Sequence, residues 1–444
     1  MIIFPPKKSK IILFFISIIL LSLLTICGIP TGANTKESKI QEKLTFFLDS
    51  KSNDKLMKIQ NEFGSNNVEY IPEINLVNLK IDNENEFKKY NIEYTKLPNI
   101  DIESNLSSSS LDNIYTIFPN PLYSNFNWSY SRITEPLNGR KGNQGKDVKI
   151  AIIDSGIDLT HPGFKEQDLT QINYSDSESN EDEYGHGTQV AGVIATLSPK
   201  AKLYSYKVMN DEEGDSYKII KAIIDASNRN VDIINISLGT EKNLNTSEYI
   251  NIKAFEMAVE YAKNKGIFVV GSAGNSSKNL DEQKNEVHMP GGLKNVITVA
   301  ATTKNGHKAD YSNYGSKVDI SGPVGWFGEE YQINKTIDAR EMMITYYPIT
   351  KTSPFETPGA IPKGTTLSFG TSLAAPEVSS ALATLISQNK SCGNLKKFNY
   401  DKIYRKLMTS TYKYNNIKDI GVGEVRITNW LSDFVSFFDK KIFK

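Results

Sequence analysis

The stretch IAIIDSGID, Ile150–Asp158, contains the turn from which the fold can be worked out. It belongs to the apolar run Val148–Ile153, which predicts a buried strand, and Asp154 follows that run directly. Gly156 permits a sharp turn after the strand. A carboxylate at the end of a buried strand is costly unless it is hydrogen-bonded, so Asp154 needs a partner. Taken alone, Asp154 is also explained as a residue that begins a loop or caps a helix.

The chain beyond this stretch alternates strands and helices. Four more apolar runs predict strands, and three stretches have helical periodicity. The strands are Ala201–Met209, Val231–Leu238, Ile267–Val270 and Val296–Ala301, and the helices are Gly187–Leu197, Tyr217–Asn228 and Lys253–Gly266. Near-continuous apolar strands that alternate with helices are typical of a parallel sheet covered on both faces. We therefore predict an α/β domain whose functional residues lie beyond the carboxyl ends of its strands.

The N-terminus predicts export. Three lysines precede an apolar run from Ile11 to about Ile29, and the small residues Thr31–Ala33 follow. This pattern is typical of a secretory signal peptide, here residues 1–33, and predicts a secreted, extracellular protein. Retention in the membrane through the same segment is the alternative, because the run is near spanning length. Removal of the segment would leave Cys392 as the only cysteine, so no internal disulfide is expected.

Residues 34–100 predict a small α+β unit. Its strands are expected in Lys43–Asp49 and Val68–Ile81, and its helices in Asn53–Gly64 and Asn85–Asn91. The stretch Asp101–Asn113 is polar, serine-rich and without periodicity, which predicts an exposed, cleavable linker, here residues 101–118. A small unit, a linker and a large domain over residues 119–436 form the layout of a zymogen with an inhibitory, chaperone-like propeptide.

A second motif, YGHGTQVAGVIA at Tyr184–Ala195, places His186 between two glycines at the start of an apolar helix. The glycines allow the backbone to approach a neighbour closely, and the helix behind them would fix the imidazole. A single histidine is usually structural. This chain has only four, however, and this one stands where a helix begins.

A third motif, SFGTSLAAP at Ser368–Pro376, places Ser372 at the expected N-terminus of another helix. Small residues behind it allow that helix to pack tightly, and Pro376 is expected in the first turn, where a missing N–H matters least. A hydroxyl there can meet an incoming carbonyl, and the helix amides favour developing negative charge. An ordinary serine N-cap explains the same residues when they are taken alone.

Together the motifs supply an orienting carboxylate, a base and a nucleophile, in the order Asp154, His186 and Ser372. A serine hydroxyl is a poor nucleophile until an imidazole takes its proton, and the imidazole needs a carboxylate to fix its tautomer. With these motifs the chain resembles the subtilisin-type serine proteases from Pro119 to about Leu431. The resemblance implies that Asp154 orients, His186 acts as general base and acid, and Ser372 is the nucleophile of a serine endopeptidase.

Two further segments extend the resemblance. VVGSAGN at Val269–Asn275 resembles the family's oxyanion segment, which implies that Asn275 donates its side-chain amide to the tetrahedral intermediate. The alternative is that Asn275 caps a loop. ISLG at Ile236–Gly239 resembles the strand edge that pairs with extended substrate, which implies substrate contacts from Ser237, Leu238 and Gly239.

One position departs from the family in a way that concerns calcium. Many subtilisins carry an aspartate after His-Pro in the first motif and a long loop after the histidine helix. Here Gly163 stands in that place, and the residues after the helix leave no room for the loop. Glycine has no carboxylate oxygen for Ca²⁺, so we expect no metal at the family site and no required cofactor. A different calcium site stays compatible with the sequence.

The long segment Val324–Ile349, the export signal and the small pro-segment make the chain most similar to lantibiotic leader peptidases. This similarity implies a peptide substrate, a lantibiotic precursor, and the chain's own propeptide as a second partner. Several such enzymes cut after a basic residue, and acidic residues at 211–215 and 281–286 flank loops expected to border the cleft. Such charges are also ordinary on solvated loops.

Two other functions are compatible with parts of this pattern. A broad-specificity secreted protease that degrades environmental protein would share every catalytic residue. A non-catalytic binding protein on a protease scaffold would need a broken triad, and the triad is intact by sequence. Lys+Arg and Asp+Glu both total 51, so the net charge gives no argument for nucleic acid as a partner.

Overall fold

The computed structural model describes residues 42–49, 53–96, 99–101, 126–137, 143–210, 213–334, 337–355, 361–391, 398–414 and 419–428. The predicted signal peptide, the predicted linker beyond residue 101, and Cys392 lie outside these residues. Across the described part, no helix has the length and apolar character needed to span a membrane.

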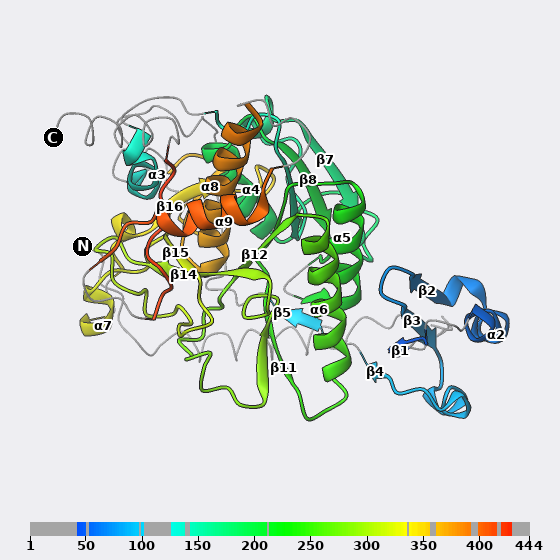
Figure 1. Ribbon diagram of the computed structural model, residues 1–444. Helices are drawn as coiled ribbons and strands as arrows, with labels where there is room; N and C mark the ends of the chain where they lie inside the picture. Colours follow the sequence, from blue (N-terminus) through cyan, green and yellow to red (C-terminus); the bar gives the residue numbers. More distant parts are fainter. Residues whose placement is uncertain are drawn as a thin grey trace, which may run out of the picture. The chain divides into compact units, whose positions relative to one another are not determined.

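A seven-stranded sheet forms the centre of the large domain (Figure 1). Its strands are β6 Lys149–Asp154, β7 Leu169–Asn173, β8 Lys202–Lys207, β10 Ile233–Ile236, β12 Phe268–Ser272, β14 Val296–Thr302 and β15 Ile320–Pro323. They follow the order β15-β14-β12-β10-β6-β8-β7, and all neighbouring pairs are parallel. β7 and β8 lie on one side of β6 and the later strands on the other, so the strand order reverses between β6 and β10. Such a reversal is where α/β sheets place their sites.

Helices cover both faces of this sheet. α4 (His186–Leu197) and α8 (Thr371–Ser391) pack on one face, and α5 (Ser216–Asn228) and α6 (Tyr249–Asn264) pack on the other. Alternate residues of β6 divide accordingly: Ile150 and Ile152 join the first core, whereas Ala151 and Ile153 join the second. Central strands are therefore buried on both sides, which explains their near-continuous apolar sequence. The predicted α/β fold with helices on both faces is confirmed.

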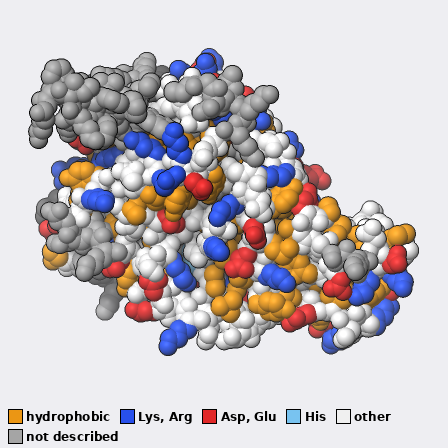
Figure 2. Space-filling model, viewed as in Figure 1, with side chains coloured by type: hydrophobic (Ala, Val, Ile, Leu, Met, Phe, Trp, Pro, Cys, Tyr) orange, Lys and Arg blue, Asp and Glu red, His pale blue; other side chains and the backbone are white. Residues whose placement is uncertain are grey.

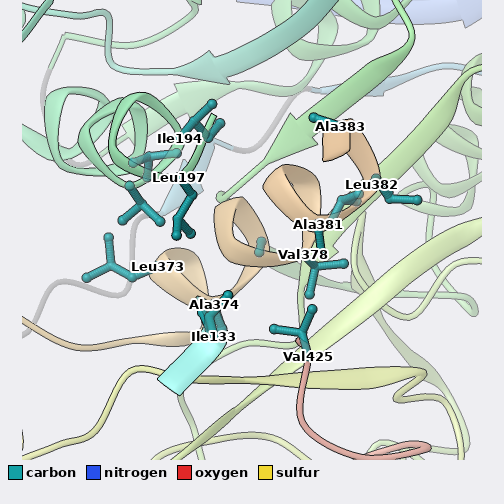
Figure 3. Packing of buried hydrophobic residues seen from close by; sticks show 14 of the residues in the cluster. Ile133, Ile194, Leu197, Leu373, Ala374, Val378, Ala381, Leu382, Ala383 and Val425 are labelled. Carbon is teal, nitrogen blue, oxygen red and sulfur yellow. The ribbon is translucent and has the colours of Figure 1, made fainter. Parts of the chain in front are cut away.

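α8 runs through the first core (Figure 3). Leu373, Val378 and Leu382 are buried side chains of this helix, and Ile194 and Leu197 of α4 belong to the same core. Burial continues along α8 as far as its last turn. A helix held on all sides fixes the position of the residues at its N-terminus, where Ser372 lies.

Residues 42–96 form a four-stranded antiparallel sheet with a core of its own. β1 (Glu42–Phe47), β2 (Val68–Ile71), β3 (Leu76–Ile81) and β4 (Thr95–Lys96) follow the order β2-β3-β1-β4, and α2 spans Asn53–Phe63. The small α+β unit is therefore present. The short helix expected at Asn85–Asn91 is split into two 3₁₀ helices, Glu84–Glu86 and Lys88–Tyr90, and Asn91 ends the second in a left-handed conformation with φ 48°.

Three two-stranded antiparallel sheets lie outside the larger sheets of the described residues, and two of them are formed within the large domain. β11 (Thr240–Asn243) pairs with β13 (Glu286–Met289), and β16 (Met343–Tyr346) pairs with β17 (Thr365–Ser368). β17 ends just before α8 begins, so the second pair leads directly into the turn that carries Ser372.

Charged side chains are interspersed over the face shown in Figure 2. Among the described residues on that face, Lys and Arg alternate with Asp and Glu, without an extended region of one sign. This face therefore has no electrostatic footprint of the kind that nucleic-acid-binding domains show.

Candidate active site

The first two predicted residues meet at the carboxyl end of β6. Asp154 is the last residue of that strand, and His186 is the first residue of α4. Asp154 Oδ1 lies 2.8 Å from His186 Nδ1, and both side chains are buried. The same oxygen accepts a hydrogen bond from Ser155 N at 2.8 Å. Because an ionised carboxylate only accepts, Nδ1 carries a proton, and Nε2 of the neutral ring is left as an acceptor.

A second carboxylate, Asp182, holds the turn before His186. It is buried and accepts hydrogen bonds from Gly185 N at 2.7 Å, Thr188 N at 2.8 Å and Thr188 Oγ1 at 2.6 Å. It also accepts from Ser155 Oγ at 2.7 Å. Asp182 thus ties the start of α4 to the residue that follows Asp154.

Ser155 completes this connection from the strand side. Its Oγ accepts from Gly187 N at 2.9 Å while it donates to Asp182. Asp154 and His186 therefore cannot separate without the loss of several buried hydrogen bonds. Sequence reasoning missed Asp182, which is one of five acidic residues in the polar run before His186.

Burial and charge act in opposite directions on His186. Burial lowers the pKa of His186. The Asp154 carboxylate, through its charge and its hydrogen bond, raises this pKa, and Asp182 raises it further. The net shift of the pKa is upward. Burial also raises the pKa of Asp182, although its four hydrogen bonds oppose that shift. The imidazole is thus a stronger base than an isolated histidine.

Ser372 is the second residue of α8, and its side chain is partly exposed. Pro376 lies in the second turn of α8 and not in the first, which corrects the sequence prediction. Its missing N–H would have donated to Ser372 O, four residues earlier. Ser237 Oγ donates to that oxygen in its place, at 2.6 Å. Ser237, predicted to bind substrate, therefore also holds the backbone of Ser372.

Asn275 contacts the same turn. Its Oδ1 accepts from Thr371 N at 2.9 Å and from Thr371 Oγ1 at 2.8 Å. Its Nδ2 lies 3.6 Å from the position that a Cβ of Gly370 would occupy. An amide fixed in this orientation can donate to an oxygen beside Ser372.

The other residues predicted to contact substrate lie between β10 and β11. Leu238 is buried and Gly239 is half-buried. Gly239 lines a pocket that also contains Ser237, Asn275 and Ser372. The structure therefore brings these four predicted residues to one place, whereas Leu238 packs into the core of α5 and α6.

The two halves of the site belong to helices that pack against each other, α4 and α8. No hydrogen bond joins Ser372 to His186, because His186 Nε2 is buried and has no partner among the described residues. A buried acceptor without a partner is uncommon and calls for an explanation. Catalytic hydrogen bonds are often formed only when substrate is bound.

The position of the family calcium site holds an aromatic ring. A Cβ at Gly163 would lie 2.4 Å from ring carbons of Tyr346, whose ring stacks on His161 at 4.6 Å. This position has neither a carboxylate nor space for one, so the residues do not fit the calcium ion bound there in many subtilisins. The described part contains no cluster of three or more His, Cys, Asp or Glu that could hold a metal. That no cofactor is required stays a prediction.

Residues 145–423 match the family model described as the subtilase family. The chain belongs to the subtilase family. It is therefore a serine protease with the subtilisin-like fold, as the sequence motifs predicted.

Three known proteins show how this subtilase compares with its relatives. A thermostable alkaline protease from Halalkalibacterium halodurans is 34% identical over 206 residues, which are 44% of this chain and about half, 53%, of that relative. The crystal structure of a lanthipeptide protease is 34% identical, with a TM-score of 0.63, over 69% of this chain and 94% of that one. The epidermin leader peptide processing serine protease EpiP from Staphylococcus aureus has a TM-score of 0.70 at 23% identity, over 87% of this chain and 97% of that one. The last likeness shows the fold.

Asp182→Asn tests the buried network. The amide NH₂ of asparagine would replace one of the two oxygens that now accept hydrogen bonds, so at least one donor would lose its acceptor. We expect the free energy of unfolding to fall by about 1–3 kcal/mol for a donor left unsatisfied. The free energy of unfolding should be measured by denaturant titration in a Ser372→Ala background, to avoid self-digestion. Activity measured with Ser372 present should also fall. The exposed neighbour Glu181→Gln is the matched control, and equal stability of the two variants would contradict a role for Asp182 in the site.

Proposed function

We propose that this subtilase is an exported serine endopeptidase that removes the leader peptide from a lantibiotic precursor. The observation that carries the catalytic part is the buried acceptor His186 Nε2, on a ring held by Asp154. The substrate part is supported by the lanthipeptide protease, which is 34% identical and matched over 94% of its length. The fold shared with EpiP is consistent with the same class of substrate.

In the proposed reaction, His186 Nε2 takes the proton of Ser372 Oγ as that oxygen attacks the scissile carbonyl carbon. Asp154 keeps the ring in the required tautomer and stabilises the imidazolium that forms. Asn275 Nδ2 donates to the oxyanion. His186 then protonates the leaving amine, which releases the mature peptide. A water molecule, deprotonated by His186, hydrolyses the ester and releases the leader.

We further propose that residues 1–33 are a signal peptide and residues 34–100 a propeptide of the catalytic domain, residues 119–436. Ion pairs support this organisation: Lys43 binds Asp215 at 3.0 Å, and Glu69 binds Lys221 at 2.8 Å. β5 (Asn99–Asp101) also pairs antiparallel with β9 (Glu213–Asp215). β5 is the last described segment before the predicted linker, so cleavage at residues 101–118 would leave the propeptide held by non-covalent contacts alone.

Ser372→Ala tests maturation and substrate together. The variant should accumulate as an uncut precursor in a protease-free host, because cleavage of the linker needs the Ser372 hydroxyl. The wild-type enzyme should cut a lantibiotic precursor at one bond, observed by mass spectrometry, and should cut casein at least about tenfold more slowly, a modest degree of substrate discrimination. Full maturation of Ser372→Ala would refute self-processing. Casein digestion at the rate of precursor cleavage would favour the broad degradative protease.

The pH dependence of activity tests the state of His186. Because its pKa is raised and the base must be neutral, kcat/KM should fall with decreasing pH through a value above the ordinary histidine pKa of about 6.5. NMR titration of the imidazole in Ser372→Ala should give the same value. Addition of Asp154→Asn should lower the pKa of His186, because burial still disfavours the charged imidazole while the carboxylate that stabilised it is gone. A pKa unchanged by Asp154→Asn would contradict the electrostatic account.

A further inference from the structure

A space without a side chain lies beside Ser372. Gly370, with φ 131°, borders this space. A Cβ at Gly370 would lie 3.1 Å from Ser372 Oγ, 3.6 Å from Asn275 Nδ2 and 3.9 Å from Ser372 N. The nucleophile and two N–H groups from distant parts of the chain thus surround one point. In the proposed reaction this is where an oxyanion can form, and each donor must then lie about 2.7–3.1 Å from that oxygen.

Asn313 holds the loop that carries Asn275. It is fully buried and lies between β14 and β15, whereas Asn275 follows β12. Hydrogen bonds join Asn313 to residues on both sides of Asn275: Ser276 N (3.1 Å) and Lys278 N (2.8 Å) donate to Oδ1, Nδ2 donates to Ala273 O (2.9 Å), and the backbone N donates to Gly274 O (2.9 Å). The backbone before and after Asn275 is therefore fixed by one buried residue.

Tyr311 holds the turn that carries Ser372. Its Oη accepts a hydrogen bond from Gly370 N at 3.0 Å and donates to Gly325 O at 2.9 Å. Burial raises the pKa of this hydroxyl, so it keeps the proton that it donates. The ring also contacts Phe369, with the two ring centroids 5.0 Å apart. Tyr311 thus fixes the backbone that leads into the turn, and with it the direction in which Ser372 N points.

One three-residue segment, Tyr311–Asn313, therefore supports both N–H donors. Its backbone contributes as well, because Tyr311 O accepts from Ser277 N at 2.8 Å. The buried Ser312 Oγ accepts from Ala301 N at 3.0 Å, which ties the segment to β14 in the central sheet. The two donors come from distant parts of the chain, and this segment fixes both of them against the same strand.

We propose that Asn313 and Tyr311 are positioning residues of the oxyanion site. Asn313 sets the position of the Asn275 amide. Tyr311 sets the turn from which Ser372 N donates. The inference rests on the proposed protease function. Because the substrate oxygen gains its charge only as the tetrahedral intermediate forms, displacement of a donor should lower kcat and leave KM nearly unchanged.

A double-mutant cycle tests the role of Asn313, with kcat measured on a chromogenic peptide amide and normalised to the serine counted by active-site titration. Asn275→Ala should lower kcat by about 10²–10³, because a donor is lost. Asn313→Ala should lower kcat at least about tenfold and change KM by less than about twofold. In the double variant, kcat should equal that of Asn275→Ala alone, because Asn313 acts through an amide that is then absent. A residue that only stabilised the fold would lower kcat by the same factor in both backgrounds.

Tyr311→Phe tests the second role. It removes only the hydroxyl, so kcat should fall about three- to tenfold with KM nearly unchanged, as for the loss of one hydrogen bond. Tyr314→Phe and Asn173→Ala are the matched controls and should keep kcat. The ring of Tyr314 contacts Lys308, and Asn173 binds residues 175–179, at the end of the edge strand β7, as Asn313 binds its own loop.

The outcomes separate this inference from the protease proposal. Unchanged kcat in Asn313→Ala or Tyr311→Phe, or a loss that Asn313→Ala adds in full to that of Asn275→Ala, would overturn the inference while the wild type stays active. No cleavage by the wild type and no titratable serine would overturn the protease proposal. Should Asn313→Ala not fold, Asn313→Asp keeps an acceptor for the loop N–H groups but loses the donor to Ala273 O. It should show the same dependence on Asn275, and full additivity would again contradict the inference.

Discussion

The structure depends on the burial of one carboxylate at the end of a strand. A buried carboxylate needs hydrogen bonds, and Asp154 Oδ1 accepts them from Ser155 N and from the imidazole of His186, whereas Oδ2 is buried without a partner among the described residues. This requires the start of α4 to lie close against the end of β6. A Cβ at Gly187 would lie 1.9 Å from Gly156 O, so only glycine permits the approach at that position. Gly187, beside His186, is therefore required by the close approach of α4 to the turn after β6.

The turn that carries Ser372 is held in a comparable way, from several elements. Ser237 donates to Ser372 O, which Pro376 leaves without its helical donor, and Asn275 accepts from Thr371. Tyr311 connects the turn to the segment Val324–Ile349: its Oη accepts from Gly370 N at 3.0 Å and donates to Gly325 O at 2.9 Å. The long segment Val324–Ile349 thus contributes to the geometry of the turn that carries Ser372.

Sequence patterns predicted the parts of the fold that are buried on both faces. Helices cover both sides of the inner strands, which are therefore apolar runs and were predicted: β6, β8, β10, β12 and β14. The two edge strands, β7 and β15, were not predicted. β15 also contains Gly322 and Pro323, which are unusual in a strand. β11 contains no apolar residue, and β13 alternates polar and apolar residues over only four positions, so neither strand was predicted.

The same distinction holds in the site. Asp154, His186 and Ser372 stand in local motifs from which their roles were predicted, and Asn275 stands in a fourth. Asp182 and His288 do not. Asp182 is one of five acidic residues in the polar run before His186, and His288, on β13, lines the pocket beside Ser372 in a fold where β13 pairs with β11. Residues that act through packing at long range were thus beyond prediction from local patterns.

In the proposed mechanism, transfer of the proton from Ser372 to His186, which Asp154 anchors, makes this arrangement an enzyme. The direct measurement is the rate at which a fluorophosphonate modifies the mature protein, with the adduct located by peptide mass spectrometry. A single adduct on Ser372, formed far more slowly when His186 is replaced by alanine, is the predicted result. Modification at another residue, or an unchanged rate without the imidazole, would show that the serine is not activated in this way.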